Sequence, residues 1–320
     1  MNEENFPQKK IKDIIDKAES ITILSHLNPD TDALGTALGI YDLLSQDKRK
    51  KIEVVNASKI LPQHLDFLPN FHKIKYQMDY QDSLVISCDC GSIDRLGFDL
   101  EGKDIINIDH HQSNTKYGTI DVVVPKYASS SQVAFELFKE IYEISANAAT
   151  CFYAALLSDT RYFTTSSVNK EVFSLAKTLV NLGAKPNEIA KNFTQRRPLS
   201  SLRILEVALS SLSLQKDARI ATLIVRKEQI KATGATVPDM EGVVDYAKSL
   251  ATVDIAIFAM ELEDGIRISL RSKGIDVSKV ALAFGGGGHK VAAGFTLTQC
   301  ELQTSIDTIL EKIDELGLLK

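Results

Sequence analysis

The sequence lacks several features that would point to whole classes of function. No uninterrupted apolar run reaches about 18 residues, so no transmembrane helix is predicted. The segment Met1–Lys10 is polar and charged, without the apolar stretch of a secretory signal, so we expect a cytoplasmic protein. An excess of positive charge is also missing, because the net charge is -5, which argues against binding to long duplex DNA. A small phosphorylated substrate fits this charge, since bound metal ions can supply local positive charge.

Cysteines are scarce and show no pattern of their own. Cys88, Cys90, Cys151 and Cys300 have neither the spacing of a zinc site nor that of a secreted disulfide framework, so we expect reduced thiols. Repeats and low-complexity segments are absent too. Hydrophobic residues make up 44% and charged residues 25% of the chain, an ordinary globular balance. The length of 320 residues fits two domains better than one.

The first half of the chain alternates short apolar runs with helical patterns. Four apolar runs predict buried strands, at 21–24, 52–55, 84–87 and 104–108. Amphipathic spacing and capping residues predict helices at 10–18, 33–44, 132–142, 146–157 and 171–182. This order is typical of an open α/β domain with a parallel sheet and helices on both faces.

The pattern changes after the segment 192–198, which we interpret as a linker. A connecting helix is predicted at 199–212, followed by strands at 220–225, 254–260 and 266–270. The last two strands are joined across Glu263-Asp264-Gly265, which predicts a hairpin turn. The predicted organisation is therefore a parallel-sheet α/β domain at 1–191, a linker with a connecting helix at 192–213, and a smaller α/β domain at 214–320.

Acidic and histidine side chains follow three of the predicted strands, and another acid ends a predicted helix: His26, Asp30 and Asp32; Asp89; Asp109, His110 and His111; and Asp159. Because the carboxyl ends of parallel strands gather in one crevice, we expect these groups to converge. The carboxylates of Asp30, Asp32, Asp89 and Asp159 would repel one another there, and two divalent cations would cancel their four charges. Together with His26 and His110 they form a mixed nitrogen and oxygen shell that suits Mn²⁺ better than Ca²⁺, while Mg²⁺ stays open. Two such cations can activate a water molecule and bind the oxygens of a displaced phosphate.

Each of these residues also has a simpler interpretation. Asp30 and Asp32 could be charges that stabilise a helix N-terminus, and Asp89 could be a buried capping acid. Cys88 and Cys90 flank Asp89 on a predicted strand. Side chains alternate along a strand, so both thiols should point away from the side that Asp89 faces and belong to the core.

Five ordered motifs resemble the DHH phosphoesterase family over nearly the whole chain. The N-terminal four are Ser25–Ala33, Asp89–Gly97, the signature triplet Asp109-His110-His111, and Ser158-Asp159-Thr160. The fifth, Gly285–Gly294, resembles the DHHA1 subdomain. A lone Asp-His-His would be weak support, whereas five motifs in order are specific.

The resemblance implies roles for these residues. His26, Asp30 and Asp89 would hold one metal, and the second would be held by Asp32, Asp89, His110 and Asp159. Asp89 would bridge the two metals, Asp109 would fix the orientation of a histidine, and His111 would lie near the scissile phosphate as electrostatic stabiliser or proton donor.

Two positions depart from the family pattern. Thr31 stands between the aspartates of the first motif, and Arg161 follows Asp159-Thr160, where the family often has glycine. Thr31 could shift its loop modestly. Arg161 could reach a substrate phosphate or pair with a surface acid.

The C-terminal domain carries the expected substrate contacts. Polar residues alternate with apolar ones from Ile266 to Arg271, which a solvated strand face would explain. The resemblance instead places Arg271 at a nucleotide phosphate. The glycine run lets backbone N–H groups approach an anion closely, although a tight turn is the alternative. The predicted substrate-binding residues are Arg161, Arg271, Ser272, Gly286, Gly287, Gly288 and His289.

The resemblance implies hydrolysis of short RNAs, linear dinucleotides or nucleotide 3′,5′-bisphosphates, as in the nanoRNase and 3′-phosphoadenosine 5′-phosphate phosphatase group. A second domain closing over the first would measure substrate length. Three alternatives stay open: a single-strand DNA exonuclease of RecJ type, a soluble cyclic di-AMP phosphodiesterase, and a non-catalytic nucleotide sensor. The expected partners are short RNA or nucleotides and no membrane, and a homodimer stays open.

Overall fold

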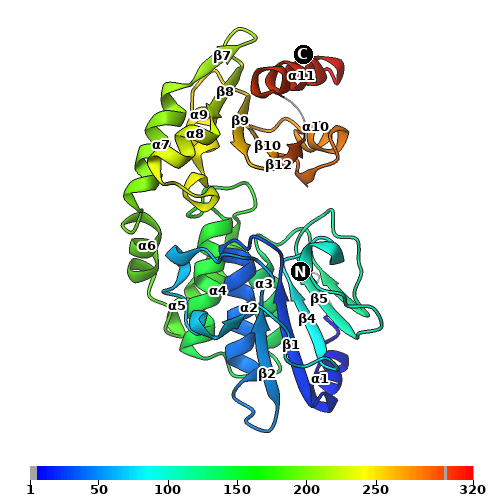
Figure 1. Ribbon diagram of the computed structural model, residues 1–320. Helices are drawn as coiled ribbons and strands as arrows, with labels where there is room; N and C mark the ends of the chain where they lie inside the picture. Colours follow the sequence, from blue (N-terminus) through cyan, green and yellow to red (C-terminus); the bar gives the residue numbers. More distant parts are fainter. Residues whose placement is uncertain (1–5, 299–300, 320) are drawn as a thin grey trace. The chain divides into compact units, whose positions relative to one another are not determined.

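The computed structural model describes residues 6–298 and 301–319 (Figure 1). The chain divides into two compact units, Met1–Arg196 and Arg197–Lys320. Cys300 lies outside the described residues, whereas Cys88, Cys90 and Cys151 are buried free thiols. In the described part of the chain, no helix is both long and apolar enough to cross a bilayer.

The first unit is built on a six-stranded sheet in the order β3-β2-β1-β4-β5-β6, and every pair in it is parallel. The strands are β1 (Ser20–Ser25), β2 (Lys51–Val55), β3 (Ile74–Lys75), β4 (Leu84–Cys88), β5 (Ile105–Asp109) and β6 (Ile120–Val123). The predicted parallel α/β sheet is confirmed. Sequence patterns missed the edge strands β3 and β6, which are short. The strand order reverses beside β1, and ligands of such sheets bind at this switch point.

The two faces of this sheet are covered differently. The α-helices of the unit bury their apolar sides in one core cluster on one face: α1 (Gln8–Lys17), α2 (Thr31–Leu44), α3 (Ser130–Phe138), α4 (Ala146–Asp159), α5 (Lys170–Asn181) and α6 (Pro186–Thr194). The other face is covered by the 3₁₀ helix η3 (Ile93–Leu96) and by loop side chains such as Phe98 and Tyr117. The α-helical cover that we expected on both faces is therefore confined to one, because the connection from β4 to β5 forms only a 3₁₀ turn.

Helices α2 and α4 pack closely against each other in the centre of this unit (Figure 1). A Cβ atom at Gly35 would lie 2.7 Å from the carbonyl oxygen of Cys151, and one at Gly39 would lie 2.3 Å from the ring of Phe152. The two glycines therefore let the helix backbones approach. This packing fixes the start of α2 relative to the end of α4, where Asp32 and Asp159 lie.

The second unit contains a mixed six-stranded sheet in the order β11-β12-β10-β9-β8-β7, in which only β8 and β9 pair in parallel. Its strands are β7 (Ser213–Gln215), β8 (Ile220–Val225), β9 (Ile255–Leu262), β10 (Gly265–Ser272), β11 (Gly287–His289) and β12 (Ala292–Leu297). Its α-helices are α7 (Leu199–Ser210), α8 (Lys227–Thr233), α9 (Val243–Lys248), α10 (Ser278–Ala283) and α11 (Leu302–Glu315).

Helix α7 is part of this second unit. We expected it to be a connector, but Ile204 and Ala208 are buried in the core formed with β8 and α9. The expected linker at 192–198 is also partly helical, since α6 extends to Thr194. The predicted hairpin is confirmed, with Glu263 and Asp264 between β9 and β10.

Candidate metal centre

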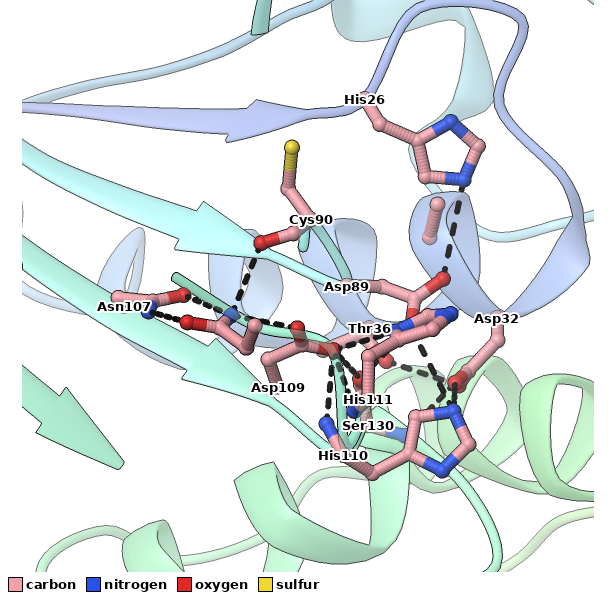
Figure 2. A network of polar contacts seen from close by, with 12 residues as sticks. His26, Asp32, Thr36, Asp89, Cys90, Asn107, Asp109, His110, His111 and Ser130 are labelled. Carbon is pink, nitrogen blue, oxygen red and sulfur yellow. Dashed lines mark hydrogen bonds and ion pairs between the residues drawn. The ribbon is translucent and has the colours of Figure 1, made fainter. Parts of the chain in front are cut away.

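The polar ends of several elements meet at the carboxyl edge of the parallel sheet (Figure 2). His26 follows β1, Asp89 follows β4, and Asp109 ends β5 with His110 and His111 directly after it. Asp30 and Asp32 lie at the start of α2, and Asp159 ends α4. The structure thus brings all the predicted metal ligands of the first unit into one cluster.

The cluster consists of two groups that share Asp89. In the first group, His26 Nε2 lies 4.0 Å from Asp30 Oδ2 and 3.8 Å from Asp89 Oδ2. In the second, His110 Nε2 lies 3.8 Å from Asp32 Oδ2, 3.7 Å from Asp89 Oδ1 and 3.5 Å from Asp159 Oδ2. Asp89 therefore presents one oxygen to each group. The distances exceed ordinary hydrogen bonds and leave room for a cation bonded to each atom at about 2.0–2.2 Å.

Backbone carbonyl groups fix which nitrogen of each histidine faces the carboxylates. His26 Nδ1 lies 2.8 Å from the carbonyl oxygen of Leu27, and His110 Nδ1 lies 3.1 Å from that of Tyr127. A carbonyl oxygen only accepts, so Nδ1 of His110 carries the hydrogen. At His26 the shorter contact, to Leu27, favours the same tautomer over the 3.3 Å contact of Nδ1 with the Arg95 guanidinium, which only donates. Nε2 and the carboxylate oxygens opposite it are then all acceptors, an arrangement that a bound cation satisfies.

The electrostatics of the carboxylates support the same conclusion. Burial, followed by the charges of Asp89 and Asp159, raises the pKa of Asp32 well above its ordinary value. Burial also raises the pKa of Asp159 to about 6, against the opposing effect of His110. Desolvation raises the pKa of Asp30 as well, but its electrostatic interaction with His26 and the hydrogen bond from the N–H of Ala33 outweigh it and lower the pKa. Without cations, this site therefore destabilises ionised Asp32 and Asp159.

A dependence of stability on pH follows for the metal-free protein. A carboxyl group whose pKa rises from 3.8 to about 6 on folding, as that of Asp159 does, stabilises the fold at low pH, and this contribution is lost as pH rises through 6. The thermal unfolding midpoint in excess chelator should therefore fall between pH 5 and pH 8. The decrease should be smaller in Asp159→Asn, because the asparagine does not ionise. Equal decreases in both proteins would contradict this account of Asp159.

The N-terminus of α3 holds two of the carboxylates in place. The backbone N–H of Ser130 donates to Asp32 Oδ2 at 2.6 Å, and that of Ser131 donates to Asp32 Oδ1 at 3.1 Å. The Ser130 hydroxyl donates to Asp89 Oδ1 at 2.8 Å. In the sequence, the run Ser129–Ser131 indicates only helix caps, and Ser129 is the residue that caps. A helix cap uses a single hydroxyl, so the two further serines were the sequence signal that could have pointed to a contact such as that of Ser130 with Asp89.

Asp109 is fully buried and orients His111. Its Oδ1 atom lies 2.7 Å from His111 Nδ1 and also accepts the backbone N–H groups of His110 and His111, at 2.7 and 3.2 Å. These interactions, led by that with His111, overcome the effect of burial and lower the pKa of Asp109. Burial lowers the pKa of His111, but Asp89 and Asp109 outweigh it and raise the pKa to about 9. In the metal-free protein His111 can therefore carry a proton at neutral pH, and its side chain is 20% exposed.

The backbone at Asp89 corrects our expectation for the flanking cysteines. Asp89 has a φ of 55°, in the left-handed region, directly after β4 ends. This turn breaks the strand alternation, so Cys88 packs in the core under the helices and Cys90 packs on the opposite face of the sheet. Both are core residues, as expected, but they do not share a face. Burial raises the pKa of Cys88 well above its usual range and that of Cys90 to about 11, so both thiols are poor nucleophiles.

The two departures from the family pattern have different structural costs. Thr31 is the buried first residue of α2 and does not have a left-handed backbone. Arg161, Tyr162 and Phe163 follow α4 with φ values of 47°, 60° and 63°. Glycine would adopt that conformation more easily, and a non-glycine residue costs about 1–2 kcal/mol. Thr31 therefore fits its position, whereas Arg161 occupies a strained one.

The predicted substrate residues of the second unit lie around β10 and β11. Ser272 is buried and its hydroxyl donates to the carbonyl oxygen of Ile275, so it holds this turn in place. The glycine run is partly a strand, because Gly287–His289 forms β11 and pairs with β12. A Cβ atom at Gly286 would lie 2.2 Å from the carbonyl oxygen of Gly294, whereas one at Gly287 would contact nothing within 4 Å. Packing thus requires glycine at 286 but not at 287.

Family models match both units of the chain. The model of the DHH family N-terminal domain matches residues 20–156, and the model of the DHHA1 domain matches residues 217–316. Among curated proteins, the bifunctional oligoribonuclease and PAP phosphatase NrnA of Thermus thermophilus is 30% identical, covering 92% of this chain and 89% of its own. A protein of the same name from Bacillus subtilis is 24% identical over 87% of this chain and 90% of its own.

Solved structures give the same relationship at the level of fold. An exopolyphosphatase-related protein from Bacteroides fragilis superposes with a TM-score of 0.87 at 26% identity, covering 97% of this chain and 96% of its own. The exonuclease RecJ bound to manganese superposes with a TM-score of 0.52 at 12% identity, covering 98% and 94% of the two chains, which shows a shared fold alone.

Proposed function

Because this chain belongs to the DHH phosphoesterase family and is a metal-dependent hydrolase of phosphate esters, we propose that it hydrolyses short oligoribonucleotides, linear dinucleotides and nucleotide 3′,5′-bisphosphates to mononucleotides. The names of the Thermus and Bacillus relatives support this substrate class. One structural observation carries the proposal: the two carboxylate oxygens of Asp89 face two separate groups of ligands.

We assign one cation to His26, Asp30 and Asp89, and the other to Asp32, Asp89, His110 and Asp159. The mixture of imidazole and carboxylate ligands favours Mn²⁺. When bound, the two cations supply Lewis acidity for the attacking water and for the phosphoryl oxygens. The site fits these cations, because its acceptor atoms face one another and its buried carboxylates are stabilised by nearby positive charge.

The residues of the chain itself supply proton transfer and orientation. Asp109 holds the His111 ring through Nδ1, so that Nε2 is the nitrogen available to a substrate. As the bond between phosphorus and the leaving oxygen breaks, His111 Nε2 gives its proton to that oxygen. This assigns His111 as the general acid.

The proposal is tested with purified protein treated with chelator and then resupplied with Mn²⁺ or Mg²⁺. A linear RNA dinucleotide and adenosine 3′,5′-bisphosphate should both be hydrolysed only after metal is added. Turnover of cyclic di-AMP alone would favour the cyclic dinucleotide alternative. Binding of nucleotides without turnover of any of them would contradict an enzymatic role.

The glycine run offers a test of substrate contact that is free of folding effects. Gly287→Ala adds a methyl group into open space, so the variant should fold normally. If a phosphate approaches this backbone, the methyl group should obstruct it and raise KM about tenfold, a loss of about 1.4 kcal/mol of binding. Steady-state kinetics on a dinucleotide measure the change. Gly286→Ala is the structural contrast, because its methyl group would collide with β12 and lower the unfolding midpoint. An unchanged KM in Gly287→Ala would leave the run a purely structural feature.

A further inference from the structure

A side chain outside the predicted site contacts the carboxylate that orients His111. Asn114 lies in the loop after β5, and its Nδ2 atom donates to Asp109 Oδ2 at 2.6 Å. The opposite oxygen, Asp109 Oδ1, accepts the Nδ1–H of His111 at 2.7 Å. The carboxylate of Asp109 is thus held from both sides: Asn114 donates to Oδ2, while His111 and two backbone N–H groups hold Oδ1.

The orientation of the Asn114 amide follows from its partners. Its Oδ1 atom accepts the backbone N–H of Lys116 at 2.7 Å, and a backbone N–H can only donate. The carboxylate of Asp109 can only accept, and so can the carbonyl oxygen of Cys90, which lies 3.1 Å from Asn114 Nδ2. A flipped amide would set donor against donor at Lys116 and acceptor against acceptor at Asp109 and Cys90. The donor of Asn114 therefore has to face Asp109.

Behind Asn114, the polar chain continues into the sheet. Asn107, which is fully buried on β5, donates through Nδ2 to Asn114 Oδ1 at 3.0 Å and to Asp121 Oδ1 on β6 at 2.8 Å. The contacts run from Asp121 through Asn107 and Asn114 to Asp109 and His111, and Figure 2 shows Asn107, Asp109 and His111 within this network. Such anchoring to rigid strands limits the movement of a catalytic side chain.

We propose that Asn114 is a positioning residue for the reaction: through Asp109 it holds the His111 ring so that Nε2 faces the leaving oxygen. This inference rests on the proposed role of His111 as proton donor. Without the amide, Asp109 Oδ2 loses its donor, so the carboxylate and the imidazole ring bonded to it are held less tightly. Proton delivery to the leaving oxygen then becomes slower, whereas the metal ligands keep their places. Partners that orient a working side chain in this way typically contribute 10–100-fold to activity.

The test compares two substrates that differ in their need for a proton. A linear RNA dinucleotide expels a ribose oxygen that must be protonated, whereas thymidine 5′-monophosphate p-nitrophenyl ester expels a nitrophenolate that leaves without one. In Asn114→Ala with Mn²⁺, kcat on the dinucleotide should fall about 10–100-fold, while kcat on the nitrophenyl ester should stay near the wild-type value. His111→Ala should lose more activity on the dinucleotide than on the nitrophenyl ester, and its loss on the dinucleotide should exceed that of Asn114→Ala.

Tyr117→Phe is the matched control for packing and stability. Its hydroxyl lies 3.0 Å from the same carbonyl oxygen of Cys90 and 3.0 Å from the Ser87 hydroxyl, and it makes no hydrogen bond to Asp109. This variant should lose stability without discriminating between the two substrates. If Asn114→Ala lowers both activities equally, as a general loss of folded or metal-loaded protein would, the positioning role is overturned.

A second readout does not depend on activity. The Nδ1–H proton of His111, held against Asp109, should give a low-field resonance in the metal-free protein that is present in Tyr117→Phe and lost to exchange in Asn114→Ala. Persistence of the resonance in Asn114→Ala would overturn the inference. If the wild-type protein hydrolyses neither substrate, the proposed function fails, and the resonance still decides whether Asn114 positions His111.

Discussion

Asp89→Asn should reduce kcat on a linear dinucleotide at least about a thousandfold, equivalent to about 4 kcal/mol of transition-state stabilisation. Asp89 presents one oxygen to the group around His26 and the other to the group around His110. The amide keeps the shape of the side chain but removes its charge and replaces one ligand oxygen by a nitrogen that cannot coordinate. Metal analysis of the dialysed variant should show fewer than two cations per chain.

A control variant separates this effect from a general change of charge. Asp99→Asn alters the same charge in the connection between β4 and β5, where Asp99 is exposed and accepts the backbone N–H of Glu101. This variant should keep both its metal content and its turnover. If Asp89→Asn bound two cations and turned over like the wild type, the shared-ligand model would be wrong.

Glu53→Gln should lower the free energy of unfolding by about 3 kcal/mol, because it breaks a buried network around a fully buried charge. The Glu53 carboxylate, with an exposed fraction of 0%, accepts hydrogen bonds from the Thr22 hydroxyl at 2.8 Å and from Lys75 Nζ at 3.0 Å. It also accepts the backbone N–H groups of Asp79 and Tyr80, each at 3.2 Å. A glutamine turns one acceptor into a donor that faces other donors.

Asp79→Asn is the comparison for this prediction, and both variants are measured by denaturant unfolding of the metal-free protein. Asp79 pairs with the same lysine at 2.6 Å, but its side chain is 59% exposed. An exposed pair of this kind contributes about 1 kcal/mol or less. Similar losses in the two variants would show that the Glu53 network does not stabilise the edge of the sheet as described.

The location of the candidate site could be predicted from the sequence because it depends on a simple rule. Apolar runs predicted β1, β4 and β5, and a parallel arrangement brings the residues that follow each strand to one edge. His26, Asp89 and His110 therefore could be placed together without coordinates. The hairpin between β9 and β10 was equally accessible, since its turn residues lie between a continuous apolar run and an alternating strand.

Other features depend on contacts between distant segments and left no local signal. The contacts of Ser130 with Asp32 and Asp89 depend on how α3 is docked, and that of Asn114 with Asp109 depends on the path of a loop. In the sequence, Gly35 only lowers the helix propensity of its segment, whereas in the structure it allows α2 to approach α4. Likewise, the left-handed turn at Asp89, which separates its two cysteine neighbours, is not encoded by a glycine.

The central claim is that this chain hydrolyses short phosphodiesters, and a time course of products with 5′-labelled RNAs tests it most directly. The substrates would range from two to about twenty-four nucleotides, so that the longest exceeds a typical single-strand binding site, each incubated with the purified protein and Mn²⁺. We predict rapid conversion of dinucleotides to mononucleotides and poor cleavage of the longest strands. Processive shortening of the long strands at a rate equal to that of the dinucleotides would contradict the claim and favour an exonuclease of long substrates.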